Sequence, residues 1–252
     1  MAKMSLLEIV QSIHNDLDLD EINSIDDTVE SQQVAQIVKG SYYAMLGNRN
    51  WPHTRRVTQL EGVGNTLRPN YLKIPSTWKQ MDSFSYDKSK ITDTSIKIDS
   101  VTYKEPDDFL RFVSLRNSSN TNVKTVTDTS GVRLLILKDV APTYWTSFDD
   151  QYIVCDSYDD AVNSTLVGSK TQCMAYVEPS WTMTDDFIPD LPSEAFVALV
   201  EESKSTASLD LKQAANQKAE QRSVKQQRWL SRKAWTAAGG VDYPDYGRKG
   251  RR

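Results

Sequence analysis

The stretch Lys212–Trp235 reads KQAANQKAEQRSVKQQRWLSRKAW, and it decides how the C-terminal part of the chain is organised. Alanine, glutamine, lysine and arginine favour a helix. However, the stretch is basic along its length and has small alanines where a helix in a closed core would have leucines. We therefore expect this helix to face partners other than a single core of its own.

Two tryptophans in this stretch support that expectation. Trp229 and Trp235 have Gln, Arg and Lys as neighbours. They are six residues apart, which is about 600° around an α-helix, so they lie on different faces. One core cannot easily bury both side chains, and we expect a partner protein to cover at least one.

The charge of the chain is divided unevenly. The net charge of the 252 residues is -4, but residues 212–252 contain eleven Lys or Arg and only three Asp or Glu. This segment carries +8, so the first 211 residues carry -12. An acidic body with a basic tail can meet nucleic acid, an anionic membrane or an acidic protein surface, and charge alone does not choose among them.

The N-terminal residues predict two helices. Ser5 and Glu8 form a capping box ahead of a short amphipathic helix that runs to Leu17. Asp27 and Glu30 predict a second capping box, which opens a helix to about Leu46 with Gly47 as its C-cap.

From Thr54 to about Pro179 the apolar pattern has the period of two that is typical of strands, with one short helix predicted from Pro106 to about Arg116. After Ser193 the pattern predicts either one long bent helix or two helices that run to about Trp235.

The predicted fold class is α+β. A helical-bundle frame, made of the N-terminal helix pair and a long C-terminal helix, holds a β-rich middle insert and ends in an extended arm. The predicted divisions are 1–53 for the first part of the bundle, 54–188 for the insert, 189–236 for the second part of the bundle and 237–252 for the arm.

The sequence predicts no catalytic, cofactor-binding or metal-binding residues. The two cysteines and two histidines lack metal-ligand spacing, and no phosphate-binding glycine motif or nucleophile elbow occurs. Three adjacent aspartate pairs are typical of solvated turns: Asp149–Asp150, Asp159–Asp160 and Asp185–Asp186. No apolar run approaches the roughly 18 residues that a membrane span needs, and the N-terminus has no signal-peptide pattern, so we expect a soluble protein made in a cytoplasm.

Two stretches resemble a known family. RNWPHTRR (Arg49–Arg56) and the block from PDLPSEAF to QRWLSRKAW (Pro189–Trp235) are similar to the head-to-tail adaptor proteins of short-tailed bacteriophages. These proteins are also called tail tubular protein A, gatekeeper or head-completion proteins. The resemblance covers about the first 60 and the last 65 residues, and the β-rich middle resembles the family only loosely.

The resemblance implies a structural virion protein and not an enzyme. A ring of twelve copies would sit beneath the portal in the virion tail after assembly in the host cytoplasm, and it would contact the tail nozzle or tail tube protein. Double-stranded DNA would pass through its channel without sequence-specific binding, past acidic walls that repel phosphates. Muralytic activity has been suggested for some members.

This interpretation predicts two interfaces, a portal-binding surface with large side chains and a contact between subunits with small ones. For the portal-binding surface we expect Arg228, Trp229, Leu230, Arg232, Lys233, Trp235, Tyr243, Pro244, Tyr246 and Arg248. For close contacts between subunits we expect Ala207, Ala214, Ala215 and Ala219.

Two alternatives remain open at this stage. The basic, aromatic tail could bind nucleic acid by stacking bases on its aromatic rings. The paired carboxylates could serve a peptidoglycan hydrolase, which needs two carboxyl groups held across a cleft.

Overall fold

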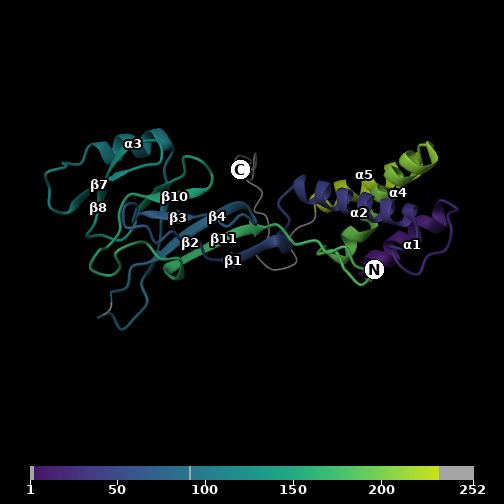
Figure 1. The fold of residues 1–252 in the computed structure, drawn as a ribbon, viewed down its shortest axis with the longest axis horizontal. Coiled ribbons are helices and arrows are strands. Elements are labelled where there is room, and N and C mark those ends of the chain that lie inside the picture. Colours follow the sequence, from purple (N-terminus) through teal and green to yellow (C-terminus); the bar gives the residue numbers. More distant parts are fainter. Residues whose placement is uncertain (1–2, 91, 233–252) are drawn as a thin grey trace, which may run out of the picture. The chain divides into compact units, whose positions relative to one another are not determined.

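The computed structural model describes residues 3–90 and 92–232 of the chain (Figure 1). The described residues divide into two compact units. The helical unit is drawn from Met1–His53 and Pro179–Arg252, and the β-rich unit is Thr54–Glu178. Each unit has its own hydrophobic core. The fold class is therefore α+β, as the sequence predicts.

The helical unit is built around helix α4, which contacts each of the other helices of that unit. A 3₁₀ turn, η3 (Ser193–Ala195), leads into α4, and another, η1 (Pro52–Thr54), follows α2. The helices are α1 (Leu6–Asp16), α2 (Val29–Gly47), α4 (Phe196–Lys212) and α5 (Gln217–Arg232).

The predicted capping box of the first helix is confirmed. The hydroxyl of Ser5 accepts from the backbone N–H of Glu8 at 3.2 Å, and the Glu8 carboxylate accepts from the backbone N–H of Ser5 at 2.8 Å. Both bonds satisfy donors that the first turn of a helix leaves unpaired. The helix is thereby fixed one residue after the cap, and its apolar face is buried.

The predicted cap of the second helix is wrong by one residue. Thr28 is the N-cap of α2 and forms its capping box with Ser31, whose hydroxyl replaces the expected glutamate. Asp27 instead accepts the backbone N–H groups of Asn23 and Ser24, so its carboxylate stabilises the preceding loop. Several short polar residues in succession can each cap a helix, and tertiary packing selects among them.

The other end of α2 also differs from the prediction. Gly47 is the last helical residue, and the C-cap is Asn48 with φ -65° in the right-handed region. The chain leaves the helix without the left-handed residue that favours glycine at this position.

The stretch Lys212–Trp235 contains a helix break, so the C-terminal part of the helical unit forms two helices and not one long bent helix. Helix α4 ends at Lys212, and Gln213 has a left-handed backbone with φ 50°. The hydroxyl of Ser208 then donates to the Ala214 carbonyl at 2.7 Å, and the Asn216 side chain accepts from a backbone N–H in the first turn of α5 at 3.1 Å. These bonds close the connection between the two helices.

Helices α4 and α5 pack against each other as an antiparallel pair. The buried hydroxyl of Ser223 donates to the Glu202 carboxylate at 2.6 Å, and Arg222 lies 3.3 Å from the Glu201 carboxylate. The Gln226 side chain reaches back to the carbonyl of Glu194. Ser223 therefore lies opposite Glu202 within α4, and Gln226, about one turn later on α5, lies opposite Glu194, just before α4 begins. These contacts fix the register of the antiparallel pair.

The described residues of the β-rich unit form three sheets, one α-helix, α3 (Pro106–Ser114), and a 3₁₀ turn, η2 (Gly168–Lys170). A four-stranded sheet has the order β1-β11-β4-β5, a five-stranded sheet the order β2-β3-β10-β9-β6, and β7 pairs with β8. All strand pairs are antiparallel except β6 with β9. The strands are β1 (Arg55–Thr58), β2 (Glu61–Gly62), β3 (Tyr71–Lys73), β4 (Trp78–Asp87), β5 (Ile98–Ser100), β6 (Thr102–Tyr103), β7 (Val123–Thr127), β8 (Arg133–Leu137), β9 (Tyr144–Thr146), β10 (Tyr152–Cys155) and β11 (Thr171–Val177).

Both cysteines lie in the core of the β-rich unit. Cys155 and Cys173 are free thiols and are buried. Burial raises the pKa of Cys173 to about 12 and raises the pKa of Cys155 well above its usual value. Both are therefore protonated and poorly nucleophilic at neutral pH.

The segment that precedes η3 packs with the helices. Residues 179–188 were predicted to belong to the insert, but Trp181 and Phe187 pack against the helical core. The backbone N–H of Leu6 donates to the Phe187 carbonyl at 2.7 Å, and that of Ile25 donates to the Asp185 carboxylate at 2.9 Å. In the structure, the helical unit therefore includes this segment.

Candidate protein interface on helix α5

Helix α5 has two faces of different character. Ala219, Ser223 and Leu230 are buried, and they repeat at the spacing of one helical stripe. Val224 and Trp229 lie outside this stripe, at the two sides of the opposite face, and are 40% and 50% exposed. The buried stripe packs within the helical unit, so the outward face is the surface that can meet another molecule.

The outward face combines aromatic, aliphatic and cationic side chains. Val224, Lys225, Arg228 and Trp229 line a shallow surface groove together with polar side chains from the first turns of α5. Exposed tryptophan beside arginine is typical of protein interfaces, because each offers a large contact area and a directional polar group. We name these four residues the α5 surface patch.

The end of α5 is held by the RNWPHTRR stretch. The Arg49 guanidinium donates to the carbonyl of Leu230 in the last turn of α5, and it lies 3.7 Å over the ring of Trp51. Burial lowers the pKa of Arg49 from its usual value. A cation at the C-terminal end of a helix is favourable, because unpaired carbonyls concentrate negative charge there.

Two further side chains fix this stretch. The indole N–H of Trp51 donates to the Met45 carbonyl at 2.9 Å. His53 Nε2 lies 2.8 Å from the Asp190 carbonyl and donates to it in the matching tautomer. Burial lowers the pKa of His53, and this bond opposes the shift. The sequence indicated structural roles for Trp51 and His53, but it gave no signal that this stretch supports the end of α5.

The residues expected at the portal fall into three groups. Arg228 and Trp229 lie on the outward face, whereas Leu230 is buried in the helical core and offers no side-chain surface. For Arg232 only the backbone, at the end of α5, is described. Outside the described residues lie Lys233, Trp235, Tyr243, Pro244, Tyr246 and Arg248.

The alanines expected between subunits divide in the same way. Ala207 and Ala219 are buried within the chain, on α4 and α5. Their small side chains allow close packing of helices inside one chain and leave no surface for a neighbouring subunit. Ala214 and Ala215 are exposed in the connection between the two helices.

The carboxylate pairs have local structural roles. Asp149 accepts from the backbone N–H groups of Gln151 and Tyr152, and Asp159 accepts from that of Ala161. Over residues 3–90 and 92–232, no group of three or more His, Cys, Asp or Glu side chains is arranged to hold a metal ion. Within the same ranges, no helix combines the length and the apolar character that a membrane span requires.

No protein-family model matches the chain, and a search of curated proteins found no significant match.

Proposed function

We propose that the protein is a head-to-tail adaptor of a short-tailed bacteriophage. In this proposal, copies of the chain form a ring under the portal, bridge it to the tail nozzle and continue the DNA channel. The helical unit acts as the bundle of the ring, the β-rich unit is its insert, and the basic C-terminal segment is the arm that docks on the portal.

The observation that carries the proposal is the α5 surface patch. Trp229 is half exposed on the last turns of α5, and the basic segment that follows begins directly after this helix. A large aromatic side chain next to Arg228 supplies an anchor for a protein partner. Since Arg49 and Trp51 fix the end of α5, the patch is held in place before a partner arrives, which lowers the entropic cost of binding.

Charge favours a protein partner over nucleic acid. The first 211 residues carry -12, and two of their acidic side chains, Glu201 and Glu202, lie on α4 directly against α5. Such a body repels a phosphate backbone at close range, whereas an acidic patch on a protein needs to meet only the basic outward face.

The test is electron microscopy of the full chain mixed with the portal protein of the same virus. Rings bound at one face of the portal would support the proposal. The matched variants are Trp229→Ala, which removes the proposed anchor, and Leu115→Ala, which removes an 86% exposed apolar side chain from the β-rich unit. Only Trp229→Ala is expected to reduce docking.

Two other results would favour the alternative functions. Tight binding to duplex DNA with a steep dependence on salt, combined with no portal complex, would favour the nucleic-acid alternative. A clear zone on peptidoglycan that a single Asp or Glu substitution abolishes would favour the hydrolase.

A further inference from the structure

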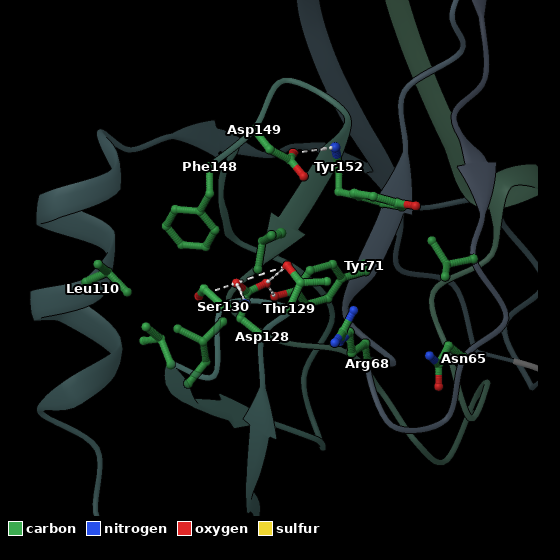
Figure 2. Close-up of a pocket in the computed structure, with 14 residues that line it drawn as sticks. Asn65, Arg68, Tyr71, Leu110, Asp128, Thr129, Ser130, Phe148, Asp149 and Tyr152 are labelled. Carbon is green, nitrogen blue, oxygen red and sulfur yellow. Dashed lines mark hydrogen bonds between the residues drawn. The ribbon is translucent and has the colours of Figure 1, made fainter.

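The β-rich unit contains a cavity of about 420 Å³, well separated in sequence from the residues of the adaptor proposal. This volume is in the range of about 300–1,000 Å³ that small-molecule sites occupy. Its lining includes aliphatic side chains from strands β8 and β10, from α3 and from loops, among them Leu134, Val154 and Leu110. Polar and aromatic side chains complete the lining (Figure 2).

Three aromatic rings line the cavity. Tyr71 and Tyr152 lie on the neighbouring strands β3 and β10, with ring centroids 6.4 Å apart. Phe148 precedes β10 and is 39% exposed. Its ring meets that of Phe109 on α3 edge to face at 6.3 Å, which orients it toward the cavity (Figure 2). Aromatic faces carry partial negative charge and attract cations.

Two carboxylates add full negative charge. Asp128 accepts from the Tyr71 hydroxyl at 2.7 Å and from the backbone and hydroxyl of Ser130 at 3.0 and 2.6 Å. Burial alone would raise the pKa of Asp128, but these bonds outweigh it and hold the pKa well below its usual range. Asp128 is therefore ionised at neutral pH without a salt-bridge partner in the described part of the chain.

Asp149 is the carboxylate with capacity for a ligand. Its Oδ1 accepts the backbone N–H groups of Gln151 and Tyr152 at 2.9 and 3.0 Å, which fixes the side chain. Its Oδ2 accepts no hydrogen bond from the described residues. One oxygen thus holds the carboxylate in position, and the other is available to a donor that enters the cavity.

Arg68, a residue of the same chain, already places a cation at one side of this cavity. Its guanidinium lies 5.9 Å over the ring of Tyr71, and its Nε donates to the Thr127 carbonyl at 3.1 Å. In the view of Figure 2, Arg68 lies on one side of Tyr71, and Asp149 and Phe148 lie on the other. Among the described lining residues, the ionised side chains are two carboxylates and one guanidinium, so the site has a net negative charge.

We propose that this cavity binds an organic cation, an alkylammonium or alkylguanidinium group whose charged end meets Asp149 and whose stem packs among Phe148, Tyr152 and the aliphatic lining residues. Burial of the apolar stem favours binding, and the charged end gains an ion pair and cation–π contacts in a partly desolvated site. Two sources supply this chemistry: a lysine or arginine side chain of a partner protein, or a free polyamine.

Ligand-observed nuclear magnetic resonance with the full chain tests the proposal. The probes are n-butylammonium and n-butylguanidinium, with n-butanol as the neutral molecule of similar size. We expect both cations to bind and n-butanol to bind at least fivefold more weakly. Equal binding of n-butanol, or binding of glucose without binding of either cation, would overturn the proposal.

Two variants of equal charge locate the site. Asp149→Asn keeps an oxygen for the two backbone N–H groups and removes the charge, and we expect it to weaken cation binding about fivefold, the size of one partly exposed ion pair. Asp150→Asn makes the same charge change one residue away, outside the cavity lining, and should leave binding unchanged. Equal weakening by both variants would show general charge attraction only and refute a specific site.

A second pair of probes separates the sources. Arginine blocked at its amino and carboxyl groups represents a side chain of a partner, and spermidine represents a free polyamine. Stronger binding of blocked arginine supports a protein partner, and stronger binding of spermidine supports a diffusible ligand. Phe148→Ala should weaken both about threefold, because it removes one aromatic wall.

Discussion

Arg116 and Asp156 form a buried ion pair in the β-rich unit, with Nη2 2.8 Å from Oδ2 and side chains only 12% and 5% exposed. The Asp156 carboxylate also accepts the backbone N–H groups of Thr143 and Tyr144 at 3.0 and 2.9 Å. The guanidinium also donates to the Leu135 carbonyl at 3.0 Å. The pair thus connects the end of α3 to three strands and has its hydrogen-bonding capacity largely satisfied.

We expect Arg116→Met to lower the free energy of unfolding by about 3–5 kcal/mol, because it leaves a buried carboxylate without its cation. Arg111→Met is the control, since Arg111 lies 4.0 Å from Asp108 with side chains 83% and 68% exposed. An exposed pair of this kind contributes at most about 1 kcal/mol. Chemical denaturation measures both, and equal losses would show that the buried pair has no special role.

We expect Asp128 to make the free energy of unfolding depend on pH in the acidic range. Its folded pKa is lowered, so its hydrogen bonds contribute their full stabilisation above the unfolded pKa of about 3.9 and lose it as pH falls through the folded pKa. Asp128→Asn places an amide group against donors from Ser130 and Tyr71. We expect the variant to be less stable at pH 7 and pH 5, with the difference from wild type shrinking below about pH 4. A difference that stays constant to pH 2 would contradict this account.

Local sequence signals predicted much of the fold. The Ser5–Glu8 capping box places α1, and Pro106 at the first position places α3, because both act through neighbouring residues in the chain. The strand-like pattern between Thr54 and Pro179 does not show which strands pair. A three-residue strand such as β9 (Tyr144–Thr146) exists because β10 and β6 pair with it.

The candidate sites depend on longer-range geometry. Trp229 and Leu230 were both expected at the portal, but the register set by Ser223 and Glu202 buries one and exposes the other. Composition shows that a helix is basic and aromatic, but it does not show which residue faces α4. The cavity was missed because its lining comes from strands, loops and a helix between Val63 and Val154, which only the folded sheets bring together.

Gly168 should tolerate no larger residue. A Cβ at this position would lie 2.2 Å from the backbone oxygen of Leu60, and backbone cannot yield as a flexible side chain can. The same region is closed by Thr171, whose hydroxyl donates to the Gly168 carbonyl and accepts from the Leu60 N–H. We expect Gly168→Ala to cost about 3 kcal/mol of unfolding free energy.

At Gly40, in contrast to Gly168, substitution by alanine is expected to raise the free energy of unfolding. Gly40 lies within α2, is exposed, and has no atom within 4 Å of an added Cβ. Gly40→Ala should stabilise the chain by about 0.5–1 kcal/mol, because alanine loses less backbone entropy in a helix. Thermal denaturation of both variants checks the two signs, and destabilisation by Gly40→Ala would show that the space around α2 is occupied.

Substitutions at the adjacent residues Trp229 and Leu230 can distinguish an effect on docking from an effect on stability. Leu230→Ala removes a side chain that is 2% exposed and should cost about 2–5 kcal/mol, while docking of the remaining folded protein changes little. Trp229→Ala removes a half-exposed ring and should cost only about 1 kcal/mol, but it should weaken portal binding at least tenfold. Denaturation and co-sedimentation with portal rings measure the two effects. If both variants lost stability without a specific loss of docking, α5 would serve only the fold, and the proposed interface would have to lie elsewhere on the chain.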